Sequence, residues 1–373
     1  MENDAMTEQE LEKALRTAAE ADVAVIFAGL PEIFESEGYD RTSMKLPQCQ
    51  DRLIEEVLKV QPNVVVVLHN GSPVELPWAD KVSAILEMYL GGQGVGEACD
   101  WLLYGEANPS GRLAETFPYR LEDNPSFLHF PGNGKRVLYG EDIFVGYRYY
   151  DTKKVPVRYA FGHGLSYTEF AYEDLNLSSA QMTDEDILTV SLKVKNSGKT
   201  EGKEVVQLYV ADLCGISERP VKELKGFAKV HLLPGEEKTV SMEILARDLS
   251  YYEERLGDWY APSGTYRILI GHASDDIRLH ADVVFETKKK LPLRVDFTTT
   301  FGELLDHTKT APVITELLAP LAAAAASAEG MSDEYKKLGE QVIREMPLKS
   351  LLGQMPGEQV EQLIGQLNCL LAQ

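Results

Sequence analysis

The stretch V-A-V-I-F-A-G-L-P-E-I-F-E-S-E-G-Y-D-R-T-S-M-K-L-P, residues 23–47, decides the fold of the first part of this chain. Its apolar start, residues 23–30, is too short and too rich in β-branched residues for a free helix, and it is typical of a strand buried on both faces. An acidic loop, residues 32–47, follows directly. In open α/β sheets, functional groups lie on the loops that leave the carboxyl ends of such strands. The position therefore predicts a functional loop, although a solvated acidic surface loop would have the same composition.

The segments around this stretch repeat its strand pattern. Thr7 and Glu10 have the spacing of a capping box, which predicts a helix that begins there and ends before the first strand. Helical spacing over residues 50–60 then leads to a second buried strand at residues 63–68, and a third apolar run covers residues 83–89. This alternation predicts part of a doubly wound parallel sheet, with about three strands.

A cluster of glycines, at positions 91, 92, 94 and 96, follows the third apolar run. Glycines at a helix start can let backbone N–H groups approach a phosphate. The spacing here matches neither the dinucleotide fingerprint nor a P-loop, and no Lys-Ser/Thr pair follows it. We therefore interpret the cluster as a tight strand-to-helix turn that lines one edge of a pocket.

Three further segments follow the α/β pattern of residues 1–118. Residues 119–165 are rich in Pro, Gly and aromatic residues but show no periodic pattern. This composition favours an interdomain linker that is packed as a strap, and the alternative is a set of aromatic side chains that stack on sugar rings. Residues 166–287 alternate with period two between turn residues, as in a β-sandwich of the immunoglobulin or fibronectin III type. Residues 288–373 have helical spacing interrupted by prolines. The predicted fold is thus a partial α/β domain, an all-β domain and a small helical tail.

The charge balance limits the class of partner. The chain has 37 Lys and Arg against 59 Asp and Glu, a formal net charge of −22 at pH 7. This charge argues against binding to nucleic acid or to an anionic membrane surface. The start of the chain lacks the basic and apolar regions of a signal peptide, and no apolar run approaches the roughly 20 residues of a membrane span. We expect a cytoplasmic protein without a cofactor, and the cysteine spacing predicts no metal site.

Six motifs in order carry a resemblance to a known family. They are E-S-E-G-Y-D-R-T-S-M-K-L-P at 35–47, N-G-S-P-V-E at 70–75, Y-L-G-G-Q-G-V-G at 89–96, N-P-S-G-R-L-A-E-T-F-P at 108–118, Y-G-E-D-I-F-V-G-Y-R-Y-Y-D at 139–151 and F-G-H-G-L-S-Y-T-E-F at 161–170. Together they resemble the C-terminal half of glycoside hydrolase family 3, the β-glucosidase-like enzymes. The resemblance implies a fibronectin-like domain after the α/β domain, and a β-linked glucoside or oligosaccharide as substrate.

Under this resemblance, the acidic loop carries one of the two catalytic carboxyl groups. Hydrolysis of a glycosidic bond uses two such groups, roughly 5 Å apart in retaining enzymes, and a general acid at neutral pH needs a raised pKa. The resemblance implies that Glu37 is the acid/base residue, with Glu35 as the alternate. Gly38 lets the backbone turn beside the acid, and we predict that Asp40 and Arg41 form a structural ion pair. The supporting loop residues are Gly38, Tyr39, Asp40 and Arg41.

The nucleophile is missing from the predicted site. The resemblance implies an Asp on a (β/α)8 barrel that precedes this region in the family, and no stretch of roughly 250 residues is present here to form one. We therefore expect Met1 to be an internal start and the chain to be inactive alone.

Three hypotheses stay open for the role of such a chain. It is half of a glycosidase that a barrel-bearing partner chain completes, a non-catalytic carbohydrate-binding or assembly module, or a decayed product without activity. An unpaired strand edge in the partial sheet also predicts pairing with another chain, either a partner or a second copy in a homo-oligomer.

Overall fold

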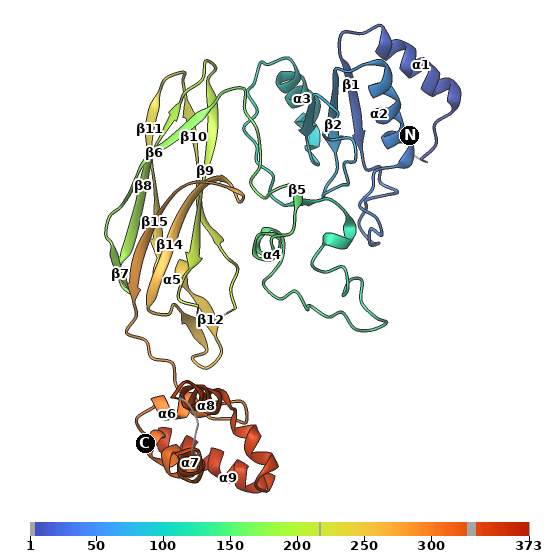
Figure 1. The fold of residues 1–373 in the computed structure, drawn as a ribbon. Helices are drawn as coiled ribbons and strands as arrows, with labels where there is room; N and C mark the ends of the chain where they lie inside the picture. The colour runs from blue at the N-terminus through green and yellow to red at the C-terminus, as the bar shows by residue number, and fades with distance from the viewer. Residues whose placement is uncertain (1–3, 216–217, 327–332, 373) are drawn as a thin grey trace. The chain divides into compact units, whose positions relative to one another are not determined.

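The computed structural model describes residues 4–215, 218–326 and 333–372 (Figure 1). The chain divides into two compact units, the first comprising Met1–Tyr251 and Ala261–Lys288 and the second comprising Tyr252–Tyr260 and Lys289–Gln373. Along the chain, a mixed α/β region is followed by a β-sandwich and then by helices, which confirms the predicted fold class. No helix in the described part of the chain combines the length and the apolar character needed to cross a membrane.

The α/β region is built on a parallel sheet with the strand order β1-β2-β3. The strands are β1 (Ala24–Gly29), β2 (Val64–His69) and β3 (Ala84–Glu87), and the first two helices are α1 (Glu8–Ala19) and α2 (Gln48–Val60). Thr7 and Glu10 form the predicted capping box at the start of α1. Because the three strands are parallel, the chain leaves all of them at the same edge of the sheet.

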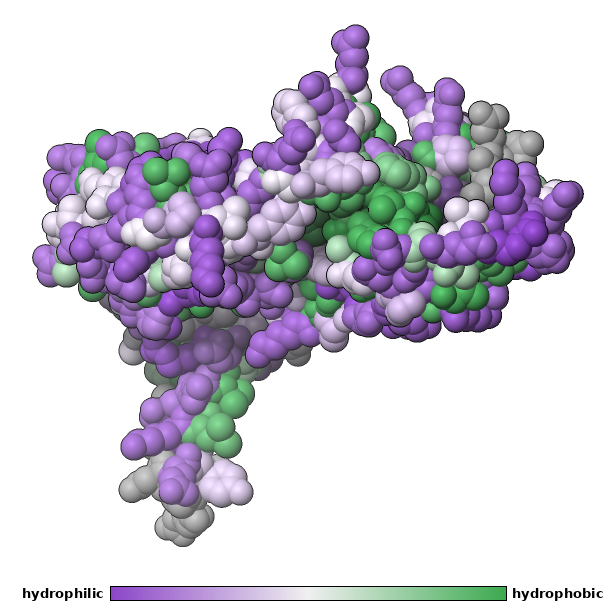
Figure 2. Space-filling view, turned by 90° about the horizontal axis from the view of Figure 1, so that it is seen from above, coloured by the Kyte–Doolittle hydropathy of each residue, from purple (hydrophilic) through white to green (hydrophobic). Residues whose placement is uncertain are grey.

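Only one face of β1 is covered. Ala24, Ile26 and Ala28 pack into a core that includes side chains of α1, α2 and β2. On the other face, Val25 and Phe27 are 42% and 60% exposed. The prediction of a strand buried on both faces is therefore wrong, because α1 and α2 both pack into the same core. Figure 2 shows hydrophobic side chains gathered in a hollow of the α/β region.

The glycine cluster forms a turn before a helix. The 3-10 helix η1 (Gly92–Gly94) leads directly into α3 (Val95–Leu103). Gly92 has a φ of +67°, and a Cβ on Gly91 would lie 2.6 Å from the Val95 side chain, so this turn requires glycine at both positions. None of the four glycines lines the pocket described below, so the prediction that they border a pocket is wrong for that pocket.

The β-sandwich consists of a five-stranded sheet, β10-β9-β14-β15-β7, and a three-stranded sheet, β11-β8-β6. Alternating residues of the two sheets face each other across one core, as the period-two pattern predicts. For example, Leu192 of one sheet and Ile268 of the other are both fully buried there. The strands are β6 (Phe170–Leu177), β7 (Gln181–Thr183), β8 (Ile187–Asn196), β9 (Gly202–Asp212), β10 (Glu223–Leu232), β11 (Glu237–Leu245), β14 (Gly264–Ala273) and β15 (Asp276–Glu286).

The aromatic segment between these regions packs on the sandwich. Its short helix α4 (Tyr147–Lys153) carries Tyr147, whose ring stacks on Phe161 at 4.7 Å and whose hydroxyl accepts a hydrogen bond from the backbone N–H of Leu224 at 2.7 Å. Tyr147 and Tyr150 are buried, as expected for a packed strap, whereas Tyr139 is 80% exposed. We refer to residues 119–165 as the strap.

A buried ionic cluster joins the sandwich to the α/β region. Glu204 on β9 is fully buried, and its carboxylate accepts hydrogen bonds of 2.8 Å from Nη2 of Arg112 and from the hydroxyl of Tyr172. Nδ1 of His272 lies 2.8 Å from the same carboxylate, and its Nε2 lies 2.8 Å from the carbonyl oxygen of Gly164. Arg112 belongs to the segment that leads into the candidate site, so this cluster holds that segment against the sandwich.

The second unit has a core of its own. Leu304, Ile314, Leu348, Val360 and Leu367 are buried against one another. This core covers only part of the apolar surface of the helices, since Leu338 and Val342 of the helix Asp333–Glu345 are 57% and 53% exposed. Its helices are α6 (Phe301–Asp306), α7 (Ala311–Ala326), α8 (Asp333–Glu345), η3 (Leu348–Gly353) and α9 (Gly357–Ala372).

The ionic cluster predicts a large effect of a small change. Replacing Glu204 by Gln should lower the free energy of unfolding of the first unit by about 3–5 kcal/mol, because Arg112 then stays buried without its counter-charge. Chemical denaturation followed by circular dichroism measures this loss. Glu201→Gln is the matched control, since Glu201 is exposed and lies 3.5 Å from the exposed His231. Equal stability of the two variants would contradict a structural role of the cluster.

Candidate functional site

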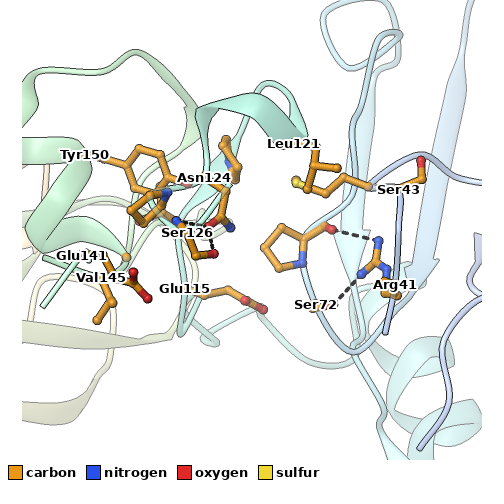
Figure 3. Close-up of a pocket in the computed structure, with 16 residues that line it drawn as sticks. Arg41, Ser43, Ser72, Glu115, Leu121, Asn124, Ser126, Glu141, Val145 and Tyr150 are labelled. Atoms are coloured by element: carbon orange, nitrogen blue, oxygen red, sulfur yellow. Dashed lines mark hydrogen bonds between the residues drawn. The ribbon is translucent and has the colours of Figure 1, made fainter. Parts of the chain in front are cut away.

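The candidate site lies where the chain leaves the three parallel strands. The loop after β1 carries the predicted catalytic residues, the loop after β2 carries Gly71 and Ser72, and β3 ends at Glu87. Figure 3 shows the neighbouring pocket, with Arg41 and Ser72 on one side and Tyr150 of the strap on the other. The predicted loop therefore lies at the carboxyl edge of the sheet.

Glu35 connects the loop after β1 to the loop after β2. Its carboxylate accepts hydrogen bonds from the backbone N–H of Gly71 at 2.7 Å and from the hydroxyl of Ser72 at 2.9 Å. Nη1 of Arg41 lies 3.5 Å from this carboxylate and also donates to the Ser72 hydroxyl. The side chains of Glu35 and Arg41 are only 19% and 18% exposed. Both oxygens of Glu35 are thus engaged within the protein.

The predicted ion pair between Asp40 and Arg41 is wrong. Arg41 pairs with Glu35, because its guanidinium reaches the loop after β2 while Asp40 stays on the surface. Glu37 is also exposed, and among the described residues no hydrogen bond or ion pair engages the carboxylate of Glu37 or of Asp40. Gly38 has a φ of +97°, which favours glycine beside Glu37.

Tyr39 holds the outer part of the same loop. It is half exposed, and its hydroxyl donates a hydrogen bond to the carbonyl oxygen of Glu32 at 2.5 Å. The loop is therefore closed on itself by Tyr39 and fastened to its neighbour by Glu35 and Arg41. Glu37 lies between these points of attachment.

The sequence did not single out two acidic side chains that the fold partly buries near this loop, Glu87 and Glu115. Burial raises the pKa of Glu87 to about 7, and its carboxylate accepts hydrogen bonds from the backbone N–H of Tyr89 at 2.8 Å and from Nδ2 of Asn70 at 3.2 Å. Burial, with the negative charge of Glu35, also raises the pKa of Glu115 to about 7. A single charged residue at the end of an apolar run is the signal that identifies Glu87 in the sequence, and Glu115 lies within the motif at 108–118.

A pocket of about 410 Å³ opens next to these loops (Figure 3). Arg41, Ser72 and Glu115 line it from the α/β region, and Asn124, Glu141 and Tyr150 line it from the strap. Among the described residues, no three Asp, Glu, His or Cys side chains are arranged to hold a metal ion. The pocket therefore combines one guanidinium and two carboxyl groups with a buried aromatic ring.

Comparison with protein families identifies both regions of the first unit. Residues 1–167 match the glycosyl hydrolase family 3 C-terminal domain, and residues 204–274 match a fibronectin type III-like domain. Thermostable beta-glucosidase B of Acetivibrio thermocellus is 47% identical over 372 residues, which is 99% of this chain and 49% of that protein. The beta-glucosidase of Kluyveromyces marxianus is 46% identical over 272 residues, 72% of this chain and 32% of that protein. The chain thus spans half or less of the length of these relatives.

Solved structures share the fold. The family 3 beta-glucosidase of Bifidobacterium adolescentis is similar with a TM-score of 0.77 and 39% identity, covering 83% of this chain and 46% of that chain. The beta-glucosidase of Kluyveromyces marxianus in complex with glucose is similar with a TM-score of 0.72 and 44% identity, covering 76% of this chain and 34% of that chain. The sequence identities of 39% and 44% are higher than those of proteins that share only a fold.

The raised pKa of Glu87 predicts how stability depends on pH. The pKa is about 7 in the folded state against an ordinary value of 4.5, so the folded state holds the proton more tightly than the unfolded state does. The resulting stabilisation is complete below pH 4.5 and is lost as the pH rises through 7, a total of about 3 kcal/mol. Denaturation between pH 4.5 and 8 should show a loss of stability that is about 3 kcal/mol smaller in Glu87→Gln than in the wild type, because the Gln side chain cannot ionise.

The exposed Glu122 provides the control for this comparison. Glu122→Gln should follow the pH dependence of the wild type, since the charge on an exposed carboxylate is solvated in both states. A constant difference between the wild type and Glu87→Gln across the pH range would contradict the assignment.

Proposed function

Because this chain carries the C-terminal domain of glycoside hydrolase family 3 followed by a fibronectin type III-like domain, we propose that it supplies the general acid/base loop of a β-glucosidase. Glu37 is the acid/base residue in this proposal, and Glu35 is a positioning residue. The observation that supports the assignment is the different engagement of the two carboxylates. Both oxygens of Glu35 accept hydrogen bonds within the protein, whereas Glu37 is exposed.

A general acid must bring its carboxyl group within hydrogen-bond distance of the leaving oxygen. Glu35 would have to give up its bonds to Gly71 and Ser72 to do this, and only Arg41 would then connect the loop to the loop after β2. Glu37 needs no such rearrangement. Glu35 and Arg41, which lie on either side of Glu37 in the chain, connect the loop to Gly71 and Ser72.

The proposal places the nucleophile outside these 373 residues, on further polypeptide of the same protein or on a partner chain that bears a barrel. The relatives named beta-glucosidase are two to three times as long as the part that this chain matches. The exposed apolar face of β1, with Val25 and Phe27, supports a covering chain, since soluble proteins seldom leave such a face open to water. The substrate in this proposal is a β-linked glucoside or oligosaccharide.

Leaving-group dependence tests the assignment of Glu37. Joining this chain to the part of the Acetivibrio thermocellus relative that it does not match supplies the proposed nucleophile. In that enzyme, Glu37→Ala should lower kcat/KM by about 100-fold or more for alkyl or sugar leaving groups but only slightly for nitrophenolate, which leaves without protonation. Azide should rescue the second step, because deglycosylation has lost its general base. The unjoined chain, which lacks the nucleophile, should show no turnover.

Two further variants complete this test. Glu35→Ala should cause a smaller loss that is independent of the leaving group, and Glu32→Ala, at an exposed position of the same loop, should leave kcat/KM unchanged. Leaving-group dependence and azide rescue in Glu35→Ala alone would move the acid/base role to Glu35. Turnover by the unjoined chain that Glu37→Ala abolishes would overturn the placement of the nucleophile.

The exposed face of β1 predicts self-association of the chain when it is alone. We expect oligomers at micromolar concentration in light scattering, and Phe27→Lys should shift the population to monomers by placing a charge on this face. Phe227→Lys is the control, because Phe227 is 69% exposed on β10 of the sandwich and far from β1 in the sequence. A wild-type monomer at these concentrations would show that this face needs no cover.

A further inference from the structure

Side-chain hydrogen bonds join the turns in which the chain leaves the three parallel strands. We propose that Asn70 is a positioning residue of the site, because its buried amide fixes the turn that holds Glu35 and joins this turn to Glu87 at the end of β3. The inference rests on the proposed function in one respect, since it takes the loop held by Glu35 to be the acid/base loop. Neither Asn70 nor Glu87 lines the pocket, so neither is assigned a contact with substrate.

Both N–H groups of the Asn70 amide are engaged. Asn70 follows directly on β2 and is fully buried. Its Nδ2 donates to the carbonyl oxygen of Ser72 at 3.0 Å and to Oε2 of Glu87 at 3.2 Å. The first bond closes the turn after β2, and the second connects this turn to the end of β3. A carboxylate in the same place would present only acceptors to a carbonyl oxygen and to another carboxylate, so these contacts require an amide.

The turn that this amide closes is the one that binds Glu35. Gly71 and Ser72 supply the donors to the Glu35 carboxylate, at 2.7 and 2.9 Å. Arg41 donates to the same Ser72 hydroxyl (Figure 3). The approach is close, since a Cβ on Gly71 would lie 3.2 Å from Oε1 of Glu35. A shift of this turn would therefore change the hydrogen bonds of Glu35 and, with them, the path of the acid/base loop.

The other end of the connection is fixed as well. Oε1 of Glu87 accepts a hydrogen bond from the backbone N–H of Tyr89 at 2.8 Å. Tyr89 has a φ of +49°, in the left-handed region that residues other than glycine seldom adopt. One oxygen of Glu87 thus holds the turn after β3, and the other holds Asn70. The three turns at this edge of the sheet consequently form one connected chain that ends at Glu35.

A purely local role of Asn70 would account for only one of its contacts. Asn side chains often close turns by bonding to the backbone two residues further on, as Asn70 does with Ser72. The bond to Glu87 spans 17 residues and closes no local turn. Oδ1 of Asn70 is buried, and no group of the described residues donates to it, which costs free energy. The contribution of this side chain therefore lies in its two donors.

Exchanging donor and acceptor across the bond between Asn70 and Glu87 tests the proposal in the 373-residue chain. The measured quantity is the rate at which the amide proton of Gly71, which bonds to Glu35, exchanges with water in magnetisation-transfer NMR. The measurement is made at pH 8, where Glu87 is mostly ionised, because burial raises its pKa to about 7.

Each single variant should loosen the turn, and the double variant should restore it. Asn70→Asp should raise the Gly71 rate by about tenfold, because two carboxylates then face each other. Glu87→Gln should raise it as well, because two NH2 groups cannot bond to each other. Combining both substitutions should return the rate to within about threefold of the wild type, since the new amide donates to the new carboxylate.

Two controls separate positioning from loss of the fold. Asn63→Asp is the matched control, because Asn63 is exposed just before the other end of β2, and it should leave the Gly71 rate unchanged. The amide of Val66, which is fully buried on β2, exchanges only when the region unfolds, so it should stay protected in every variant.

Kinetics of the joined enzyme provide the second readout. Asn70→Asp should lower kcat by about tenfold with little change in KM, because Asn70 orients the acid/base loop without contacting substrate. A purely structural role would lower the unfolding midpoint and leave the kcat of the folded enzyme unchanged.

The proposal is overturned by an unchanged Gly71 rate in both single variants, by a double variant no closer to the wild type than the single variants, or by faster exchange with an unchanged kcat. If Asn70→Asp does not fold, Glu87→Gln and the double variant test the same bond. Failure of the leaving-group test for Glu37 would leave the exchange results standing, because exchange needs no substrate. Failure of the exchange test would likewise leave the assignment of Glu37 untouched.

Discussion

The hydrogen bonds that Glu35 accepts from Gly71 and Ser72 are the contacts on which the geometry of the site depends. A loop of this length after a strand has no fixed path of its own, because its backbone lacks regular hydrogen bonds. The carboxylate of Glu35 connects this loop to the next one in the sheet, and Arg41 adds a second contact through the Ser72 hydroxyl. The exposed stretch between them, with Glu37, is consequently short and is held at both ends.

The surroundings of this connection are unusually acidic. Glu87 and Glu115 lie near Glu35, and both have pKa values raised to about 7. Arg41 is the cation among them, and the charges of Glu35 and Glu115 both act on it. Because burial raises the pKa of both carboxyl groups, the folded state binds their protons more tightly than the unfolded state does, and these side chains couple the stability of the site to pH. Acidic clusters of this kind are more typical of functional sites than of ordinary cores.

The sandwich acts as the support for this region. The carboxylate of Glu204 accepts a hydrogen bond from Arg112, and the hydroxyl of Tyr147 in the strap accepts one from the backbone N–H of Leu224 on β10. Through these contacts, the wall of the pocket that carries Glu141 and Tyr150 is held against the sandwich while the opposite wall belongs to the α/β sheet. A small-molecule site between two such walls depends on both domains being in place.

The sequence by itself determined the fold class, the capping box at Thr7, the position of the acidic loop and the family, because periodicity, capping and motif spacing depend on residues close to one another in the chain. Only the tertiary structure decided that Arg41 pairs with Glu35 rather than with Asp40, since the deciding partner, Ser72, lies 31 residues away. It also decided that β1 is covered on one face only, because burial depends on which helices pack there. The raised pKa values of Glu87 and Glu115 likewise follow from burial and from neighbours brought together by the sheet, which no local pattern encodes.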